Sequence, residues 1–102
     1  MIHVIATIRV AQGRLQDFLQ EFHRLVPHVR AEKGCIEYGP ARDVETGIAG
    51  LPGAREDVVT VVEKWESVAA LDAHLKAPHM MTYRDAVGDM VVDVDIRVST
   101  PV

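Results

Sequence analysis

The sequence predicts an α+β fold of the ferredoxin-like, split βαβ type, in which an antiparallel sheet carries helices on one face. The main observation is the order of its segments: stretches rich in β-branched residues alternate with stretches of helical periodicity as strand, helix, strand, strand, helix, strand (β-α-β-β-α-β). A second observation is the length of 102 residues, which suits one modest core. We therefore expect a single domain spanning residues 1–102.

The first strand is predicted at residues 2–10, where β-branched residues are frequent and alternate residues share a face. From Arg14 the period changes, and apolar residues recur at the spacing of one helical face. We expect this helix to run to about Glu32 and to stop at Gly34, with Pro27 kinking or weakening its last turn.

The second strand is predicted at residues 35–43, with Ile36 and Tyr38 on one face. The dipeptide Gly39-Pro40 within it indicates a bulge or an edge position. Residues 44–56 then form a glycine- and proline-containing connection that is long for a small domain. We expect this connection to act as a lid or an arm.

The third strand, predicted at residues 57–66, is apolar on both sides. Val59 and Val61 point one way, and Val58 and Val62 point the other. A strand with one face in water would alternate cleanly, so we expect both faces of the sheet to be covered over part of their length. Helices cover one face, and a second copy of the chain is the most economical cover for the other. The sequence thus predicts a homodimer that packs sheet against sheet.

The second helical region is predicted to begin after Ser67, which is suited to the N-cap position. Proline disfavours helical geometry in the preceding residue and is tolerated in a first turn, so we expect the helix to break at Ala77-Pro78 and resume with His79. A fourth strand at residues 91–99 closes the chain.

Composition and charge exclude several classes of function. A net charge of −4 provides no basic field for a nucleic-acid backbone, so we expect no nucleic-acid partner. Nothing in the sequence predicts export or membrane insertion, because no apolar run approaches about 20 residues. Cys35 is the only cysteine, which is compatible with a reducing cytoplasm and excludes Cys-based metal cages. We expect a cytoplasmic protein without a membrane partner.

Glu63 and Trp65 form the first candidate pair, because residues two apart on a strand share a face. A carboxylate beside an indole on a partly buried face can have a raised pKa and act as an acid or base. The alternative is that Trp65 is ordinary core and that Glu63 is a charge partner at the strand end.

His74, His79 and Tyr83 form the second candidate group. On a helix His74 borders the buried stripe, whereas on an unbroken helix His79 would be rotated by about 140° from it. The break at Pro78 can bend the axis and bring His79 to the same cavity, with Tyr83 one turn later on its face. The alternative for His79 is a capping role. Zinc is disfavoured because the two histidines lack the spacing of about four found in paired helical ligands, and no phosphate loop or nucleophile elbow is present.

The residues considered together resemble the antibiotic biosynthesis monooxygenase family, which includes small quinol monooxygenases. The resemblance extends over nearly the whole chain and rests on Gly34-Cys35-Ile36-Glu37-Tyr38, Val62-Glu63-Lys64-Trp65-Glu66-Ser67, Ala70-Leu71, His74-Leu75 and Pro78-His79. It implies a dimeric α+β barrel of ferredoxin-like subunits, each with a pocket between sheet and helices. It also implies oxygenation of a hydroquinone or polycyclic phenol by O2 without flavin, metal or another cofactor.

The resemblance also suggests roles for individual residues. His79 or His74 would accept the substrate's proton, Glu63 would support a histidine, and Trp65, Tyr38 and Tyr83 would contact the substrate ring. Haem degradation is disfavoured, because the haem-degrading relatives have a first-strand Asn that this chain lacks. Two other functions remain open on the same fold: a non-enzymatic small-ligand-binding or stress-response dimer, and an isomerase of small carbonyl compounds.

Overall fold

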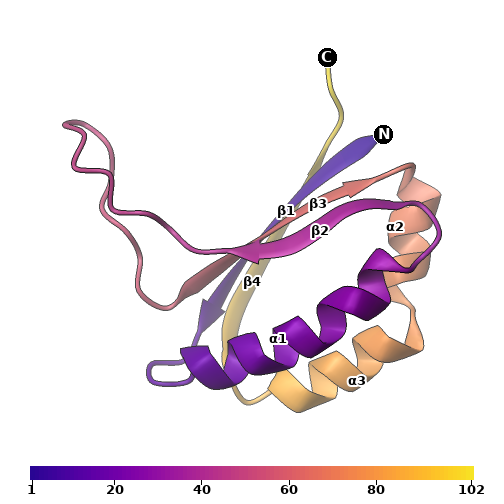
Figure 1. Ribbon diagram of the computed structural model, residues 1–102, viewed down its shortest axis with the longest axis horizontal. Coiled ribbons are helices and arrows are strands. Elements are labelled where there is room, and N and C mark those ends of the chain that lie inside the picture. Colours follow the sequence, from indigo (N-terminus) through magenta and orange to yellow (C-terminus); the bar gives the residue numbers. More distant parts are fainter.

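A computed structural model describes all 102 residues as one four-stranded antiparallel sheet with three helices on one face (Figure 1). The strand order across the sheet is β2-β3-β1-β4, so the first and third strands occupy the centre. The architecture is the ferredoxin-like α+β fold that the sequence predicts. Its elements are β1 (Ile2–Val10), α1 (Leu15–Arg30), β2 (Cys35–Ala41), β3 (Val58–Trp65), α2 (Val68–Leu75), α3 (Pro78–Val87) and β4 (Val91–Ser99).

The core lies between the sheet and the helices, and the two central strands supply much of it. Burial alternates along β1 and β3, as expected for strands with one face on the core. Ala6 of β1 lies opposite Val61 of β3 and Ile96 of β4, which fixes the register of the three strands. The helix α1 adds an apolar stripe to the same cluster: Phe18, Phe22, Leu25, Val26 and Val29.

The turn after α1 is held against the start of α2. Gly34 has a φ of +88°, a backbone conformation that residues with a side chain rarely adopt. A Cβ atom at Gly34 would lie 2.6 Å from Cβ of Ala70, and the Gly34 carbonyl accepts a hydrogen bond from the Glu66 N–H at 2.8 Å. Glycine is therefore needed here both for the turn and for the close approach to α2.

The second helical region is two helices, as the sequence predicts. The Ser67 side chain caps α2 by accepting a hydrogen bond from the Ala70 N–H at 3.1 Å. Ala77 then leaves helical geometry, with φ −65° and ψ 145°, and Pro78 opens α3 at its first position. Because proline lacks an N–H and restricts its predecessor, the break follows from the local sequence.

The strand β2 differs from the sequence prediction in the placement of its side chains. Ile36 and Tyr38 were expected on one face, but Ile36 is 53% exposed and Tyr38 is buried. The reason is a register irregularity between Cys35 and Glu37, where one residue is extra relative to β3. Of the two alternatives predicted for Gly39-Pro40, the edge position is correct, because β2 pairs with a neighbouring strand on one side only.

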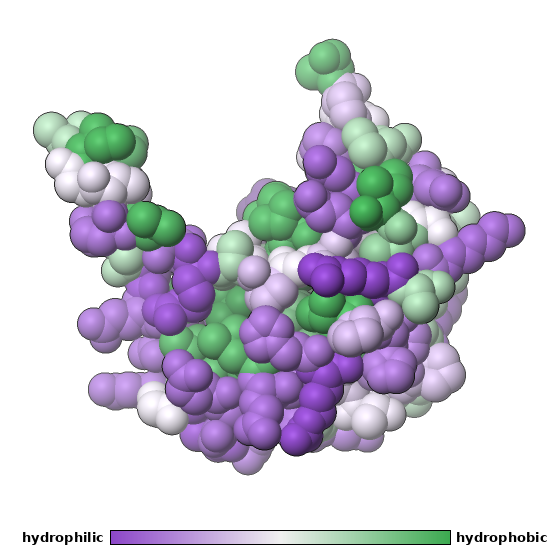
Figure 2. All heavy atoms as spheres, viewed as in Figure 1, coloured by the Kyte–Doolittle hydropathy of each residue, from purple (hydrophilic) through white to green (hydrophobic).

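The long connection between β2 and β3 projects from the sheet as an arm (Figure 1). Its base is fixed by Asp43 and Arg55, whose closest side-chain oxygen and nitrogen are 2.8 Å apart. Its far end is apolar, as Figure 2 shows, and carries exposed Ile48 and Leu51. None of its residues lines the cavity described below, so the connection is an arm and not a lid in this structure.

The face of the sheet opposite the helices is apolar only in part. Ile5 is 41% exposed there, while β4 contributes Asp93 and Asp95 to that face. The apolar residues Val94 and Ile96 of β4 point to the helix side, where they remain 47% and 49% exposed. The hydrophobic surface available to a partner therefore lies along β4 as well as at the sheet centre. None of the three helices combines the length and apolar character needed to span a membrane.

Candidate active site

A cavity of about 390 Å³ lies between the sheet and the helices α2 and α3. Twelve of its sixteen lining residues are hydrophobic, which is typical of a site for a small apolar molecule. The ionisable exceptions are Glu63, His74 and Arg84, and the phenols Tyr38 and Tyr83 add two hydroxyl groups. The site thus combines an apolar interior with a few polar groups that can orient and ionise a ligand.

His74 is the most enclosed polar residue of the cavity, with 1% of its surface exposed. Its Nδ1 lies 2.9 Å from Oε2 of Glu32, and its ring is 4.6 Å, between centroids, from the indole of Trp65. A carboxylate can only accept, so Nδ1 carries the hydrogen and Nε2 keeps its lone pair. Burial lowers the pKa of His74, although Glu32 acts in the opposite direction. The ring is therefore a neutral base that Glu32 holds in one tautomer.

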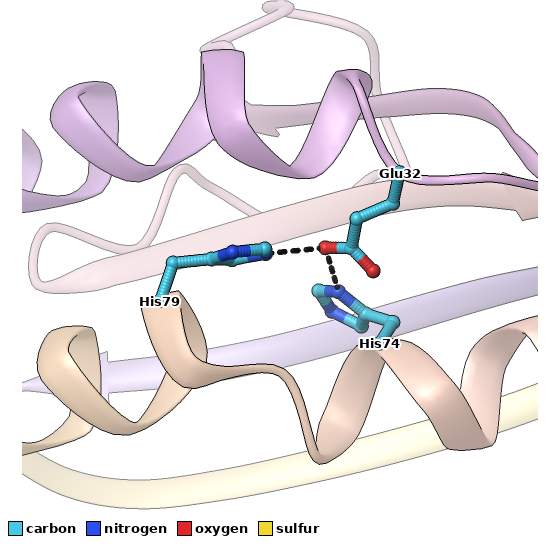
Figure 3. A group of neighbouring side chains, drawn as sticks. All are labelled: Glu32, His74 and His79. Carbon is cyan, nitrogen blue, oxygen red and sulfur yellow. Dashed lines mark hydrogen bonds and ion pairs between the residues drawn. The ribbon is translucent and has the colours of Figure 1, made fainter.

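Glu32 serves a second histidine as well. Its Oε2 lies 2.6 Å from Nε2 of His79, so one oxygen atom joins the two rings (Figure 3). The three side chains come from different elements: Glu32 from the turn after α1, His74 from α2 and His79 from α3. Sequence reasoning missed Glu32, which lies 42 and 47 residues from its two partners. The only signal available was its position beside the Gly34 turn.

Glu63 is the second carboxyl group of the site, and only 6% of it is exposed. Trp65 donates a hydrogen bond from Nε1 to its Oε1 at 2.9 Å. Burial raises the pKa of Glu63 to about 7, and the charge of Glu32 adds to this, while the indole hydrogen bond opposes it. This is the direction that a carboxylate beside an indole on a buried face can show. The side-chain hydrogen bond of Glu63 goes to Trp65, so the carboxylate that supports the histidines is Glu32 and not Glu63.

Two predicted site residues do not line the cavity. Trp65 is fully buried beneath the rings of Tyr38 and His74, and it contacts the cavity only through the residues it supports. His79 does approach His74 because of the break before α3, but it lines a separate groove between α1 and α3. Its ring stacks there on His28, with centroids 5.9 Å apart. The break thus brings the two histidines to one carboxylate but not into one cavity.

Tyr38 and Tyr83 both line the cavity. Burial raises the pKa of each phenol, so both hydroxyl groups stay protonated at neutral pH and are available as hydrogen-bond donors. The guanidinium of Arg84 lies at the same wall, where its Nη2 donates to the Leu75 carbonyl at 2.9 Å. These groups could orient a ring with oxygen substituents.

Glu32, His74 and His79 are also the one group in the structure whose atom types suit a metal ion. Their carboxylate oxygen and ring nitrogens all lie within 4.8 Å of one another. The contacts to Oε2, at 2.9 and 2.6 Å, have the lengths of charge-assisted hydrogen bonds. We therefore interpret the three residues as a hydrogen-bonded triad.

The chain is thus a small ferredoxin-like α+β protein whose apolar cavity contains acid–base groups. Residues 1–86 match the family model described as antibiotic biosynthesis monooxygenase, and the chain belongs to this family. It is 39% identical to the probable quinol monooxygenase YgiN of Escherichia coli K12, over 99% of this chain and 98% of that protein. The membership and this relative support a monooxygenase.

Solved structures agree with the architecture. Protein PA3566 from Pseudomonas aeruginosa superimposes with a TM-score of 0.82 at 25% identity, covering 99% of this chain and 93% of that one. Rv0793 from Mycobacterium tuberculosis gives a TM-score of 0.77 at 25% identity, with 99% and 94% covered. The ferredoxin-like α+β fold is therefore shared with solved chains over almost their full lengths.

Proposed function

We propose that this protein is a cofactor-independent monooxygenase that oxidises a hydroquinone or polycyclic phenol with O2. The observation that carries the proposal is His74, a buried neutral histidine at the wall of an apolar cavity, with its Nδ1 bonded to Glu32. Nε2 has no hydrogen-bond partner in the protein and is left to act as a base. The 39% identity to a probable quinol monooxygenase supports the choice of substrate class.

The first step is ionisation of the substrate. Nε2 of His74 takes the proton of a phenolic O–H, and the bonding electron pair stays on the substrate oxygen. The imidazolium that forms is stabilised by the carboxylate of Glu32, which is 2.9 Å from Nδ1. The apolar walls of the cavity limit the contact of the anion with water, and the hydroxyl groups of Tyr38 and Tyr83 can donate hydrogen bonds to it.

The second step needs no other reductant, because the ionised ring is electron-rich enough to reduce O2. One oxygen atom becomes bonded to a ring carbon, and the other leaves as water after accepting protons. For a hydroquinone the balance is hydroquinone plus O2 giving hydroxyquinone plus water, with all four electrons supplied by the substrate. Glu63, with a pKa of about 7, can supply a proton to the departing oxygen.

The test is aerobic turnover of chelator-treated protein with menadiol, measured by O2 uptake against the autoxidation blank and by incorporation of ¹⁸O from ¹⁸O2. We expect His74→Ala to lower kcat by about 100-fold. The matched control is His23→Ala, which removes an exposed histidine of α1 and should keep the wild-type rate. Wild-type uptake no faster than the blank across a panel of quinols would refute the monooxygenase and favour a ligand-binding protein.

We also propose that the protein is a cytoplasmic homodimer whose second copy covers β4 and closes the cavity beside Val94 and Ile96. Both residues line the cavity and are about half exposed, at 47% and 49%, so the cavity is open at this strand. The free thiol of Cys35 fits the reducing cytoplasm.

Light scattering at micromolar concentration tests the dimer. The wild type should have the mass of two chains, and Val98→Asp should give one, because Val98 lies on the exposed apolar side of β4. The control is Val68→Asp, a change of the same kind at a site that is 63% exposed on α2. A monomeric wild type, or a dimer that both substitutions leave intact, would contradict this interface.

A further inference from the structure

We propose that Glu32 is a positioning residue that couples the cavity base His74 to His79, so that the charge of a surface histidine sets the basicity of a buried one. The inference deepens the proposed function and rests on it, since it concerns the base that ionises the substrate. Its starting point is the shared oxygen in Figure 3: Oε2 of Glu32 is 2.9 Å from Nδ1 of His74 and 2.6 Å from Nε2 of His79.

The backbone around Glu32 is held on both sides, which fixes the point from which its side chain extends. The Glu32 N–H donates to the Val29 carbonyl at 2.9 Å, and the Glu32 carbonyl accepts from the Cys35 N–H at 3.2 Å. Gly34 secures the same turn against α2 through its left-handed conformation and its close approach to Ala70. The tight turn after α1 therefore brings one carboxylate to the junction of α2 and α3.

The three residues extend from the cavity to the surface. The side chain of His74 is 2% exposed and lines the cavity, that of Glu32 is 14% exposed, and that of His79 is 27% exposed. His79 lines the groove between α1 and α3, beside His28, Glu21 and Arg24. Solvent reaches the His79 side chain directly, whereas the His74 side chain is almost wholly shielded from solvent.

The coupling follows from sharing one negative charge. When His74 takes the substrate proton, its imidazolium is stabilised by the Glu32 carboxylate. When His79 is already protonated, its positive charge offsets the negative charge of the same carboxylate. That positive charge also lies close to His74. The pKa of His74 responds in these directions: Glu32 raises it and the charge of His79 lowers it. Protonation at the surface groove therefore weakens the base in the cavity.

Other ionisable groups face the triad, and they stay the same in the variants compared below. Arg84 of α3 also lowers the pKa of His74. Glu63 of β3 and Tyr38 of β2 share the cavity with His74, and the α1 groups His28, Glu21 and Arg24 surround the His79 side. Differences between variants then report on the triad itself.

The test is the pH dependence of kcat/KM for menadiol oxidation by the full chain and by two neutral variants. Glu32→Gln should move the acid limb down by about 1 pH unit and lower the plateau of kcat by about 100-fold. KM should change little, because Glu32 does not line the cavity. His79→Gln keeps a hydrogen-bond donor for Glu32 but removes the competing charge, so the acid limb should move to higher pH.

The control variant is Glu56→Gln, which neutralises an exposed glutamate before β3, away from the triad, and should leave the profile unchanged. If Glu32 had only a structural role, Glu32→Gln would reduce activity, but Glu32→Gln and His79→Gln would not move the acid limb of the pH profile in opposite directions. Unshifted limbs, or limbs that move the same way, would overturn the coupling.

A second readout keeps this inference separate from the proposed reaction. In ¹⁵N NMR, wild-type His74 should be in the Nδ1–H tautomer, and its titration midpoint should fall in Glu32→Gln and rise in His79→Gln. If the wild type failed to oxidise any quinol, the monooxygenase would be refuted while these midpoints still decided the coupling. A mixed tautomer in the wild type, or midpoints that ignore both substitutions, would overturn the coupling whatever the activity.

Discussion

The buried carboxyl of Glu63 should make the protein less stable as the pH rises from about 4.5 to about 7. Its pKa is about 7 in the folded protein and 4.5 for an ordinary glutamate. Between these values the folded state keeps the proton and the unfolded state has lost it, so unfolding releases a proton. The contribution of Glu63 to the free energy of unfolding is therefore fully present below pH 4.5, falls between pH 4.5 and about 7, and is constant above about pH 7.

The size of the effect follows from the same interval. A difference of about 2.5 pH units, at about 1.36 kcal/mol per unit, corresponds to about 3 kcal/mol. Glu63→Gln removes the titration but keeps an oxygen that can accept the hydrogen bond from Trp65. The free energy of unfolding of the variant should thus rise by about 3 kcal/mol relative to that of the wild type between pH 4.5 and pH 8.

Urea unfolding at a series of pH values measures this difference. Trp65 is the only tryptophan and is fully buried, so its fluorescence reports unfolding, with circular dichroism as a second probe. The lowered pKa of His74 gives the opposite trend below about pH 6.5, but it is common to both proteins and cancels in the comparison. Protein concentration must be constant because a dimer is expected. A difference that varies by less than about 1 kcal/mol over this range would refute the argument.

Two further predictions concern the supports of the site. Gly34→Ala should destabilise the protein by about 2–4 kcal/mol, the sum of a left-handed alanine and an overpacked contact, measured by urea unfolding. The control is Gly50→Ala, because Gly50 also has a positive φ, of +89°, but no atom lies within 4 Å of a Cβ placed there. It should lower the free energy of unfolding by only about 1–2 kcal/mol. Equal losses of stability in the two variants would contradict the packing argument. Trp65→Phe removes the only side-chain hydrogen bond of Glu63. The midpoint of the Glu63 carboxyl titration, followed by ¹³C NMR, should therefore rise from about 7. An unchanged midpoint would count against this contact.

The elements that the sequence predicts well are those decided by local chemistry. The β-branched alternation of residues 2–10 and 91–99 matches β1 and β4 at both ends. The two helices on either side of Ala77-Pro78 follow from the capping hydroxyl of Ser67 and the missing N–H of Pro78. In each case the residue that decides the structure lies within a few positions of the structure it decides.

The features that escaped prediction depend on contacts between distant segments. The irregularity after Cys35 arises from how β2 pairs with β3, and it turns Ile36 outward although the local alternation is regular. Glu32 looked like the end of a helix, where an acidic residue is usually solvated. Only the packing of the α1–β2 turn against α2 and α3 brings it to His74 and His79.

The two carboxyl groups of the site show why residue type alone could not assign the roles. Glu63 is enclosed by the core and has one indole N–H as donor, so burial raises its pKa and it is protonated over the acid range. Glu32 is partly exposed, and its Oε2 lies within hydrogen-bonding distance of the ring nitrogens of two histidines. Because environment separates the two, one can hold a base in its working tautomer while the other supplies a proton to the same cavity. Each proposed role therefore follows from what surrounds the carboxyl group, which the order of residues along the chain does not show.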